Sequence, residues 1–567
     1  MTKFQAIFSQ FKQKSKTINS RDVLVGLLIV FFSGWLMTST FGYHSGKMFI
    51  ASKAWSDFGA HLPLIRSFSQ GDNLPPQYPQ FAGPSIKYHY LFYFIVGLVE
   101  RLGFNIAFSL NAISAVGMGL FLWMFYQTAK LIIGKRSGAI LALYLFLFNG
   151  SLTFISFFQE NWTEGNLLES WLTLKEFANF GPWNGDSISA FWNWNIYTNQ
   201  RHLGLSFGLI LVLIWPLLKA VYQPIQAKTL PTLDLKKWIW IIWLGLILLP
   251  FLHQAGYVMT VIFILGWFLF NPSLIERYGL LYFLGLLYSV PGFFYFFEGS
   301  KSIGWQLGFL AKKTDIFSII NYWFYNLGAY FLIWPLLLLL ADKKDRKLLL
   351  IFSSYFVLAN LLKLSPDMIN NHKLVNFYGV ALVILTAKML INWWQQAGKK
   401  GLDYLRTFII LFIVLISFSG WVDAMPIVND HDLVVPDPQF EPVGVWIKEN
   451  TSSDSVFVTS TYFYHPANLV GRKTFLDYGY FSWSLGYPDK QRRKYLPMIF
   501  AQETNVNQWC NLMTGIKVNY VSINLKGSNL DPVKPKQSWL FKTQLPIKQT
   551  IDGFRIYSVT NICQSNF

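Results

Sequence analysis

The chain has 567 residues, of which 53% are hydrophobic, 18% are aromatic and only 13% are charged. A soluble protein would carry roughly 25% charged residues, so the composition excludes an ordinary soluble enzyme. The net charge of +18 does not indicate nucleic-acid binding, because the basic residues lie in short clusters between apolar runs. The sequence therefore predicts a polytopic membrane protein without a nucleic-acid partner.

The first apolar run, LVGLLIVFFSGWLMTSTF at 24–41, has about the ~20 residues that a helix needs to cross a bilayer. No small-residue cleavage site follows it, so we expect it to remain as a membrane anchor. Basic clusters such as KLIIGKR, DKKDRK and QQAGKKG favour the cytoplasmic side and place the N-terminus there. With this orientation we predict about eleven spans, near 24–42, 105–128, 137–158, 202–222, 237–252, 254–271, 278–297, 317–341, 347–364, 373–393 and 404–422.

The run YHYLFYFIVGLVERLGF at 88–104 is too short for an easy span and ends in Glu100 and Arg101. We predict a juxtamembrane helix on the outer side, because a further span would place KLIIGKR outside, against the charge rule. The domains expected from this topology are a cytoplasmic segment 1–23, a membrane domain 24–422 with outer loops 43–104 and 159–201, and an exported α/β domain 423–567.

The first outer loop begins with WSDFGAHLPLIRSFSQG at 55–71. Asp57 and His61 are four residues apart, so both lie on one face of a helix at the outer membrane boundary. Ser56 and Asp57 could instead cap that helix, which leaves a structural interpretation open. Further along the same loop, Tyr88 and His89 are candidates for a sugar or acceptor pocket.

The second outer loop is aromatic and also carries several acids. Its tryptophans are typical of membrane-interface anchors, but aromatic rings beside amides and acids also hold sugars. We take Glu160 and Asp186 as the candidate acids of this loop. Arg201, at the point of re-entry into the membrane, is a candidate for charge stabilisation.

The third outer feature is KLSPDMINNHKLVNFYG, which places Asn371, His372 and Lys373 between two apolar runs. A lysine at an outer membrane edge runs against the positive-inside preference, although it could simply extend its charge into the interface. A functional interpretation is a phosphate clamp, with Lys373 as a point charge and its neighbours as donors. A phosphate held at a membrane surface indicates a lipid-linked phosphate.

Beyond residue 422 the apolar runs stop, and FEPVGVWIKENTSSDSVFVTS predicts a helix, a turn and a strand. VNYVSINL and GFRIYSV are further strand candidates, so a small α/β domain is expected here. Both cysteines of the chain, Cys510 and Cys563, lie in it, and their spacing leaves open whether they pair. The aromatic segment 462–487 is either a glycan contact or ordinary core.

Taken together, these segments resemble the GT-C class of polytopic glycosyltransferases of bacterial type. The resemblance rests on SDFGAHLPLIRSFSQGDNLPPQYPQFAGPSIKYHYLFY in the first loop, on the short helix before the second span, and on the terminal domain opening with EPVGVWIKENTSSDS. It implies a polyprenyl-phosphate-linked sugar as donor and Asp57 as the catalytic carboxylate. Residue 59 is glycine rather than a second acid, so the loop lacks an Asp-x-Asp pair. We predict no certain cofactor and no metal-binding residues, and divalent-metal dependence stays open.

The expected reaction moves a sugar to a lipid, glycan or protein acceptor outside the cytoplasm with inversion, using Asp57 as general base. Lys373, His372, Asn371 and Arg201 are expected to bind the donor phosphate, and His61 to orient Asp57 or a substrate hydroxyl. Two alternatives remain at this point, a polysaccharide polymerase or ligase of another fold and a lipid-linked glycan transporter without covalent chemistry. The expected location is the bacterial inner (plasma) membrane.

Overall fold

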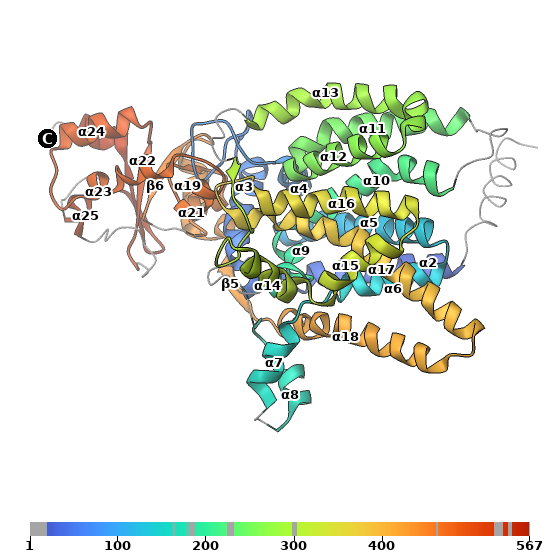
Figure 1. Ribbon diagram of the computed structural model, residues 1–567. Coiled ribbons are helices and arrows are strands. Elements are labelled where there is room, and N and C mark those ends of the chain that lie inside the picture. Colours follow the sequence, from blue (N-terminus) through green and yellow to red (C-terminus); the bar gives the residue numbers. More distant parts are fainter. Residues whose placement is uncertain are drawn as a thin grey trace, which may run out of the picture.

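The computed structural model of the chain describes residues 20–162, 165–178, 180, 188–223, 232–297, 303–460, 463–526, 537–542 and 547–565. It consists of a bundle of long helices with a smaller region of helices and strands beyond one end (Figure 1). Because a bilayer offers a backbone no hydrogen-bond partners, apolar runs of this length form helices, which satisfy those groups internally. The predicted class, an α-helical polytopic membrane protein with a C-terminal α/β region, is confirmed.

The helices of the bundle follow the apolar runs of the sequence closely. They are α2 (Ser20–Thr38), α5 (Ile106–Ile133), α6 (Arg136–Leu147), α10 (His202–Tyr222), α11 (Thr232–Leu252), α12 (Gln254–Phe270), α13 (Leu280–Phe297), α14 (Ile316–Leu327), α15 (Ala329–Leu340), α16 (Lys343–Leu361), α17 (His372–Lys399) and α18 (Asp403–Val428). Short turns η4 (Pro272–Leu274) and η5 (Ile275–Gly279) precede α13.

Among the described residues, six helices are long and apolar enough to cross a membrane, or seven if α14 and α15 form one span bent by 98°. The other expected spans coincide with α6, α11 and α12, which are shorter apolar helices, and with α16, which begins in a charged turn. The run 137–158 differs from the expectation of one helix. It breaks after Leu147 and resumes at Thr153 as α7 (Thr153–Asn161), because α18 crosses at the break. A Cβ on Gly150 would lie 2.1 Å from the carbonyl oxygen of Ile416.

Helix α17 is the most enclosed of the candidate spans, with 78% of its apolar window buried, whereas α2 and the span ending in α13 have 22% buried. Its N-terminal residues, His372 and Lys373, therefore lie near the centre of the bundle at one end. Close packing of α5 on α10 supports this arrangement, because a Cβ on Gly204 would meet the backbone of Met118 at 2.9 Å. Small residues let membrane helices approach in this way.

Ionic contacts gather at the end of the bundle away from the α/β region. Asp22 of α2 accepts Lys130 Nζ at 2.7 Å and Arg136 Nε at 3.0 Å, and Lys388 pairs with Asp342 and Asp345. These contacts involve the segments that the charge rule assigned to the cytoplasm. At the opposite end, the loops between the helices are long and carry the candidate residues.

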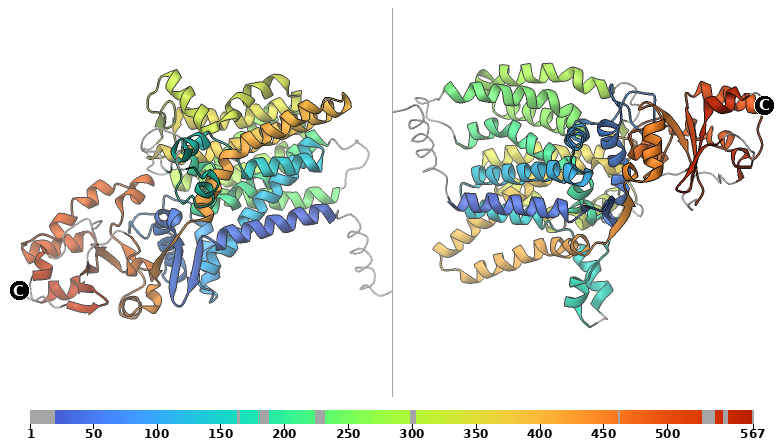
Figure 2. Two further views of the ribbon diagram at one scale, coloured as in Figure 1. Left: turned by 90° about the horizontal axis from the view of Figure 1, so that it is seen from below. Right: turned by 180° about the vertical axis from the view of Figure 1, so that it is seen from behind.

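Three segments cover that opposite end, which we call the outer end. The first holds β1 (Phe41–His44), β2 (Lys47–Ala51), η1 (Ser52–Ala54), α3 (Trp55–Ser69) and α4 (Leu91–Arg101). The second holds α7, α8 (Leu167–Leu172), η3 (Ser189–Phe191) and α9 (Asn195–Asn199). The third holds β3 (Gly304–Trp305), β4 (Leu362–Lys363) and η6 (Met368–Asn371). Helix α4 is the predicted juxtamembrane helix, and Figure 2 shows α7 and α8 projecting sideways from the bundle.

The C-terminal region follows α18. Its elements are β5 (Asp432–Pro436), η7 (Pro438–Phe440), α19 (Pro442–Asn450), β6 (Val456–Thr459), α20 (Pro466–Leu469), β7 (Lys473–Thr474), α21 (Gly479–Ser484), α22 (Asp489–Arg493), α23 (Leu496–Ile499), α24 (Val506–Gly515), β8 (Tyr520–Asn524), α25 (Trp539–Lys542), β9 (Ile547–Ile551), β10 (Phe554–Ser558) and α26 (Val559–Gln564). The main sheet has the order β7-β6-β8-β10-β9, parallel from β7 to β8 and antiparallel beyond. A disulfide joins Cys510 of α24 to Cys563 of α26.

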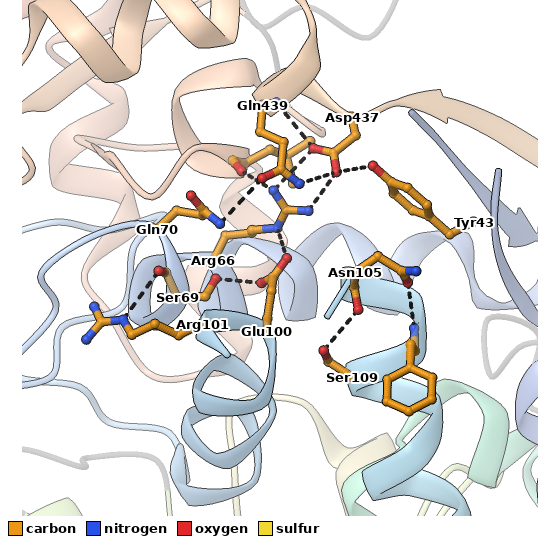
Figure 3. A network of polar contacts seen from close by, with 12 residues as sticks. Tyr43, Arg66, Ser69, Gln70, Glu100, Arg101, Asn105, Ser109, Asp437 and Gln439 are labelled. Atoms are coloured by element: carbon orange, nitrogen blue, oxygen red, sulfur yellow. Dashed lines mark hydrogen bonds and ion pairs between the residues drawn. The ribbon is translucent and has the colours of Figure 1, made fainter. Parts of the chain in front are cut away.

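The C-terminal region is attached to the first outer segment by more than its chain connection. Strand β5 pairs antiparallel with β2, so residues 432–436 complete a sheet begun by residues 41–51. Beside this sheet, Arg66 of α3 lies 2.8 Å from Asp437 Oδ2 and 2.9 Å from Glu100 Oε1 (Figure 3). All three side chains are at most 2% exposed. This buried network fixes α3 between α4 and the C-terminal region.

Candidate functional site

A cavity of about 620 Å³ lies between the outer end of the bundle and the C-terminal region. Its walls come from α3, the end of the second outer segment, the start of α17 and α21. The lining residues used below are Lys53, Asp57, His61, Tyr88, Asn195, Asn199, Gln200, Asp367, Asn370, His372, Lys373, Tyr478, Tyr480 and Trp483. The cavity thus brings together residues from all three outer segments and from the C-terminal region.

Asp57 lies in the first turn of α3 and is half-buried in the cavity wall. The helix begins after Ala54 without a side-chain cap, so Asp57 is not occupied as a capping residue. Its carboxylate forms no hydrogen bond or ion pair with the residues that the structure describes. Burial raises the pKa of Asp57 from 3.8 to about 6, and the charge of Lys373 offsets part of that rise. The group is therefore poised to exchange a proton near neutral pH.

Lys373 lies one residue into α17 and is 7% exposed, yet within the described chain its ammonium group has no hydrogen-bond or ion-pair partner. A buried unpaired charge is costly, and such groups generally serve a ligand or a reaction. The preceding residue, His372, is held on both sides of its ring. Nε2 lies 3.2 Å from the amide nitrogen of Gln200, and Nδ1 lies 3.1 Å from that of Asn376.

A second cavity of about 190 Å³ adjoins the first, and Tyr88, Asn370 and Lys373 line both. Its lining also includes a group of apolar side chains, Val258, Phe293, Phe296, Ile303 and Leu364. His89 and His253 supply polar edges. Lys373 thus stands at the boundary of the two cavities.

Behind these cavities lies a cluster of aromatic and imidazole rings. The Tyr88 hydroxyl is 3.3 Å from that of Tyr93, which lies 3.2 Å from His202 Nδ1. The ring of His61 is 4.9 Å from Tyr93, and that of His89 is 4.4 Å from His202. Burial lowers the pKa of His61 to about 3, so this side chain is neutral at physiological pH. The cluster therefore adds polar groups to the site without adding charge.

Several residues proposed from the sequence lie elsewhere. Arg201 does not line either cavity, because its guanidinium donates to Thr198 O, Asn111 Oδ1, Met37 O and Thr40 Oγ1. Asn371 is also buried behind the lining, where its amide donates to Ala359 O and Leu362 O. Glu160 is exposed on α7, away from the cavity. Asp186 lies outside the described residues.

Other lining residues come from segments that the sequence pointed to without assigning a role to the individual residues. Tyr480 and Trp483 of α21 bring the aromatic segment 462–487 to the cavity, and the Tyr480 hydroxyl donates to Asp367 Oδ2 at 2.6 Å. Asn195, Asn199 and Gln200 line another part of the wall. Their signal in the sequence was the amide-rich run NWNIYTNQ, which stands immediately before Arg201. No group of three His, Cys, Asp or Glu residues arranged to hold a metal occurs in the part of the chain that the structure describes.

Neither a family model nor a curated protein matches the sequence. Several solved structures align with the fold, among them the following two. The crystal structure of the oligosaccharyltransferase of Archaeoglobus fulgidus in the apo form is 13% identical with a TM-score of 0.44, and the alignment covers 89% of this chain and 70% of that chain. The crystal structure of ArnT from Cupriavidus metallidurans in the apo state is 12% identical with a TM-score of 0.44, covering 95% and 97%. The chain is similar to both, at an identity too low to carry over any residue or activity.

Proposed function

We propose that the protein is an integral membrane glycosyltransferase that uses a polyprenyl-phosphate-linked sugar. One observation carries the proposal: Asp57 and Lys373 face the same cavity as unpaired opposite charges, and Lys373 also faces an adjoining cavity that has Val258, Phe293 and Phe296 in its wall. A carboxylate without partners can accept a proton, and an ammonium group without partners can bind an anion. The apolar side chains of the second cavity, beside the ammonium group, suit the first part of a lipid chain.

The donor phosphate would bind at the boundary of the two cavities. Lys373 supplies the positive charge and Asn370, which lines both cavities, supplies an amide; the amide of Asn370 already donates to Ser365 Oγ at 3.0 Å, which fixes its orientation. His372 holds Gln200 and Asn376 in place beside it. Arg201, whose three guanidinium nitrogens each donate to other groups, would contribute its positive field from behind the wall rather than a direct contact.

In the proposed reaction, Asp57 removes the proton of the acceptor hydroxyl while that oxygen attacks the anomeric carbon. The bond between the anomeric carbon and the phosphate oxygen breaks, and its electron pair leaves with the phosphate. Attack from the side opposite the phosphate inverts the anomeric centre. Lys373 stabilises the charge that grows on the departing phosphate.

A hydrolase would usually need a second free carboxyl group to protonate a poor leaving group. Asp367 lines the same cavity, but its carboxylate accepts hydrogen bonds from the Tyr480 hydroxyl and from the Ile369 amide. A phosphate leaving group is a stabilised anion and needs no proton donor. The single free carboxylate of the cavity therefore fits transfer from a phosphate better than glycoside hydrolysis.

The direction of the chain across the membrane follows from the same proposal. The ionic contacts of Asp22 and Lys388 would lie on the cytoplasmic side, and the cavity and the C-terminal region would lie outside. The disulfide between Cys510 and Cys563 agrees with an oxidising compartment. We place the protein in a bacterial plasma membrane with its acceptor on the outer side, whether that acceptor is a lipid, a glycan or a protein.

The proposal is tested with purified protein in detergent or nanodiscs. Labelled sugars linked to a polyprenyl monophosphate are incubated with a membrane extract as acceptor source, with and without a chelator. The expected result is release of polyprenyl phosphate and transfer of label to the extract. Failure of folded protein to consume any donor of a broad panel would contradict the proposal and favour transport or polymer ligation.

A further inference from the structure

The charges of the large cavity are almost all committed. Lys53 Nζ lies 2.8 Å from Glu176 Oε2 and 3.9 Å from Asp430 Oδ1. Asp367 holds the Tyr480 hydroxyl. Among the charged side chains of the lining, Asp57 and Lys373 have no partner within the described residues, and the proposed function uses both. Among the described residues, a sugar in this cavity therefore meets no further free charge of either sign.

The cavity offers amide groups in place of charges. Asn195 and Asn199 are four residues apart on α9, and so share one face, and Gln200 follows directly. Each of these three side chains lines the cavity, and its amide oxygen has no hydrogen-bond partner among the described residues. Buried polar groups are nearly always partnered in folded proteins, so three unpartnered amide oxygens within one short segment indicate a ligand that supplies the missing donors. A sugar hydroxyl can donate to an amide oxygen.

The C-terminal region adds aromatic surface to the same cavity. Tyr480 is 41% exposed and Trp483 is 37% exposed, and both line the cavity. The hydrogen bond from Tyr480 to Asp367 anchors α21 to the segment that carries Lys373. Ring faces of this kind stack on the apolar faces of sugars. A cavity of about 620 Å³ falls within the usual range for a small-molecule site and holds a sugar ring beside part of an acceptor.

We infer that the transferred sugar is uncharged, and that the amides of Asn195, Asn199 and Gln200 select it by its hydroxyl groups. The inference rests on the proposed function. An amino sugar is a cation, and the one free carboxylate of the described lining that could pair with it is Asp57, the proposed catalytic base. A uronic acid is an anion, and the one free cation of the described lining that could pair with it is Lys373, which the donor phosphate already occupies. Amides and aromatic rings can bind an uncharged sugar without forming an ion pair that competes with Asp57 or Lys373.

The first test compares donors that share one polyprenyl phosphate and differ in the sugar: a neutral hexose, an N-acetylated hexosamine, an amino-pentose and a uronic acid. We expect kcat/KM for at least one neutral donor to exceed that for both charged donors by ~10-fold or more. If kcat/KM is higher for a charged donor than for every neutral donor, and Asp57→Asn loses that preference, this inference is overturned and the proposed function still stands. Consumption of none of the donors would instead contradict the proposed function.

The second test uses the amide wall directly. Asn199→Ala should lower kcat/KM for the preferred donor by ~3-fold to 10-fold, the usual range for one neutral hydrogen bond. A series of deoxy donors then identifies the hydroxyl that Asn199 contacts. Removing that hydroxyl should lower kcat/KM in wild type but cause no further loss of kcat/KM in Asn199→Ala, as a double-mutant cycle requires. Asn161→Ala is the matched control, because Asn161 belongs to the same outer loop, does not line the cavity and, among the described residues, donates to Phe157 O within its own helix. If every deoxy donor lowers kcat/KM by the same factor in wild type and in Asn199→Ala, the inference is overturned.

A third variant guards against simple unfolding. Asn199→Asp adds one carboxylate of similar size to the wall, so the ratio of kcat/KM for the amino-pentose donor over the neutral donor should rise by ~10-fold. A ratio measured within one preparation does not depend on the fraction of folded protein. An unchanged ratio in active Asn199→Asp protein would show that the wall does not contact the sugar.

Discussion

Asp57 and Lys373 face one cavity from different segments of the chain, and neither has a hydrogen-bond or ion-pair partner among the described residues. Their influence on each other is electrostatic, since Lys373 lowers the pKa of Asp57 against the effect of burial. Opposite charges that are close enough to interact and yet unpaired are costly to bury. We interpret the separation as the space that an acceptor hydroxyl and a sugar phosphate occupy.

The role of Asp57 leads to a prediction about activity. Asp57→Asn keeps the shape of the side chain and removes its ability to accept a proton, so turnover should fall by ~10²-fold to 10⁴-fold. Donor binding should change little, because the phosphate contacts Lys373 instead. The measurement is single-turnover transfer at saturating donor. An equally large rise in donor KM would assign Asp57 to binding rather than to proton transfer.

The pH dependence of wild type follows from the raised pKa of Asp57. The base works when ionised, so kcat/KM should rise with pH and level off above a midpoint near pH 6. His61 does not account for this midpoint, because its pKa is lowered to about 3. The residual rate of Asp57→Asn should lack the inflection. The same inflection in wild type and variant would assign the titration to another group.

The same pKa shift predicts an effect on stability. Between pH 3.8 and about 6 the folded state binds more protons at Asp57 than the unfolded state, so the stability falls as pH rises through this window. Asp57→Asn removes the buried charge and should stabilise the protein by on the order of 2 kcal/mol at pH 7.5. Thermal unfolding of wild type and Asp57→Asn at pH 4 and pH 7.5 measures this gain in stability. The gain should be present at pH 7.5 and small at pH 4. A loss of stability at pH 7.5 would show that Asp57 is satisfied in the fold.

Lys373 should be required for the donor phosphate. Lys373→Gln should reduce kcat/KM for the donor by ~10-fold to 100-fold, since hydrogen bonds to charged groups contribute about 1.5–3 kcal/mol. Lys47→Gln removes an exposed charge of β2 outside the cavity and serves as the control. Steady-state kinetics at increasing donor concentration gives kcat/KM for Lys373→Gln and for Lys47→Gln. Equal behaviour of the two variants would exclude a phosphate contact by Lys373.

The buried network around Arg66 should hold the site in shape. Asp437→Ala leaves Arg66 without its bidentate partner, so the free energy of unfolding should fall by about 3–5 kcal/mol. Lys448→Ala changes an exposed contact with Gln70 in the same region and should cost less than about 0.5 kcal/mol. Denaturant unfolding followed by tryptophan fluorescence compares the two variants. Similar costs would mean that α3 is positioned by other contacts.

The disulfide should stabilise the C-terminal region without serving the reaction. It closes a loop with a sequence separation of 53 residues, for which chain entropy predicts about 3–4 kcal/mol. Replacing Cys510 and Cys563 together by serine should therefore lower the unfolding temperature while transfer at low temperature persists, because α24 and α26 do not line the cavity. Loss of transfer by the folded double variant would place the bridge in the active site.

The apolar runs predicted the bundle well, because in a bilayer hydrophobic length alone selects helices. The break at Gly150 was missed, since it depends on α18 crossing there, a contact far away in the sequence. The juxtamembrane helix α4 was predicted from charge alternation, and β8 and β10 from their alternating patterns. The pairing of β5 with β2 has no local signal, because it joins residues almost four hundred positions apart.

For the site, the sequence indicated Asp57 and Lys373, whose charges stand out at the ends of apolar runs. It did not separate Asn370, which lines both cavities, from Asn371, which is buried behind them, because one residue of helical register decides this. The contribution of α21 was equally hidden, since an aromatic segment looks the same in a core and in a binding wall. Only the three-dimensional arrangement distinguishes these possibilities.

The roles of Asp57 and Lys373 are tested most directly by following one labelled polyprenyl-phosphate sugar in wild type, Asp57→Asn and Lys373→Gln side by side. Wild type should transfer the label and release polyprenyl phosphate. Asp57→Asn should bind the donor without transferring it, and Lys373→Gln should use the donor less efficiently. Transfer by Asp57→Asn at the wild-type rate would contradict proton removal by Asp57, because the proton of the acceptor would then leave by another route.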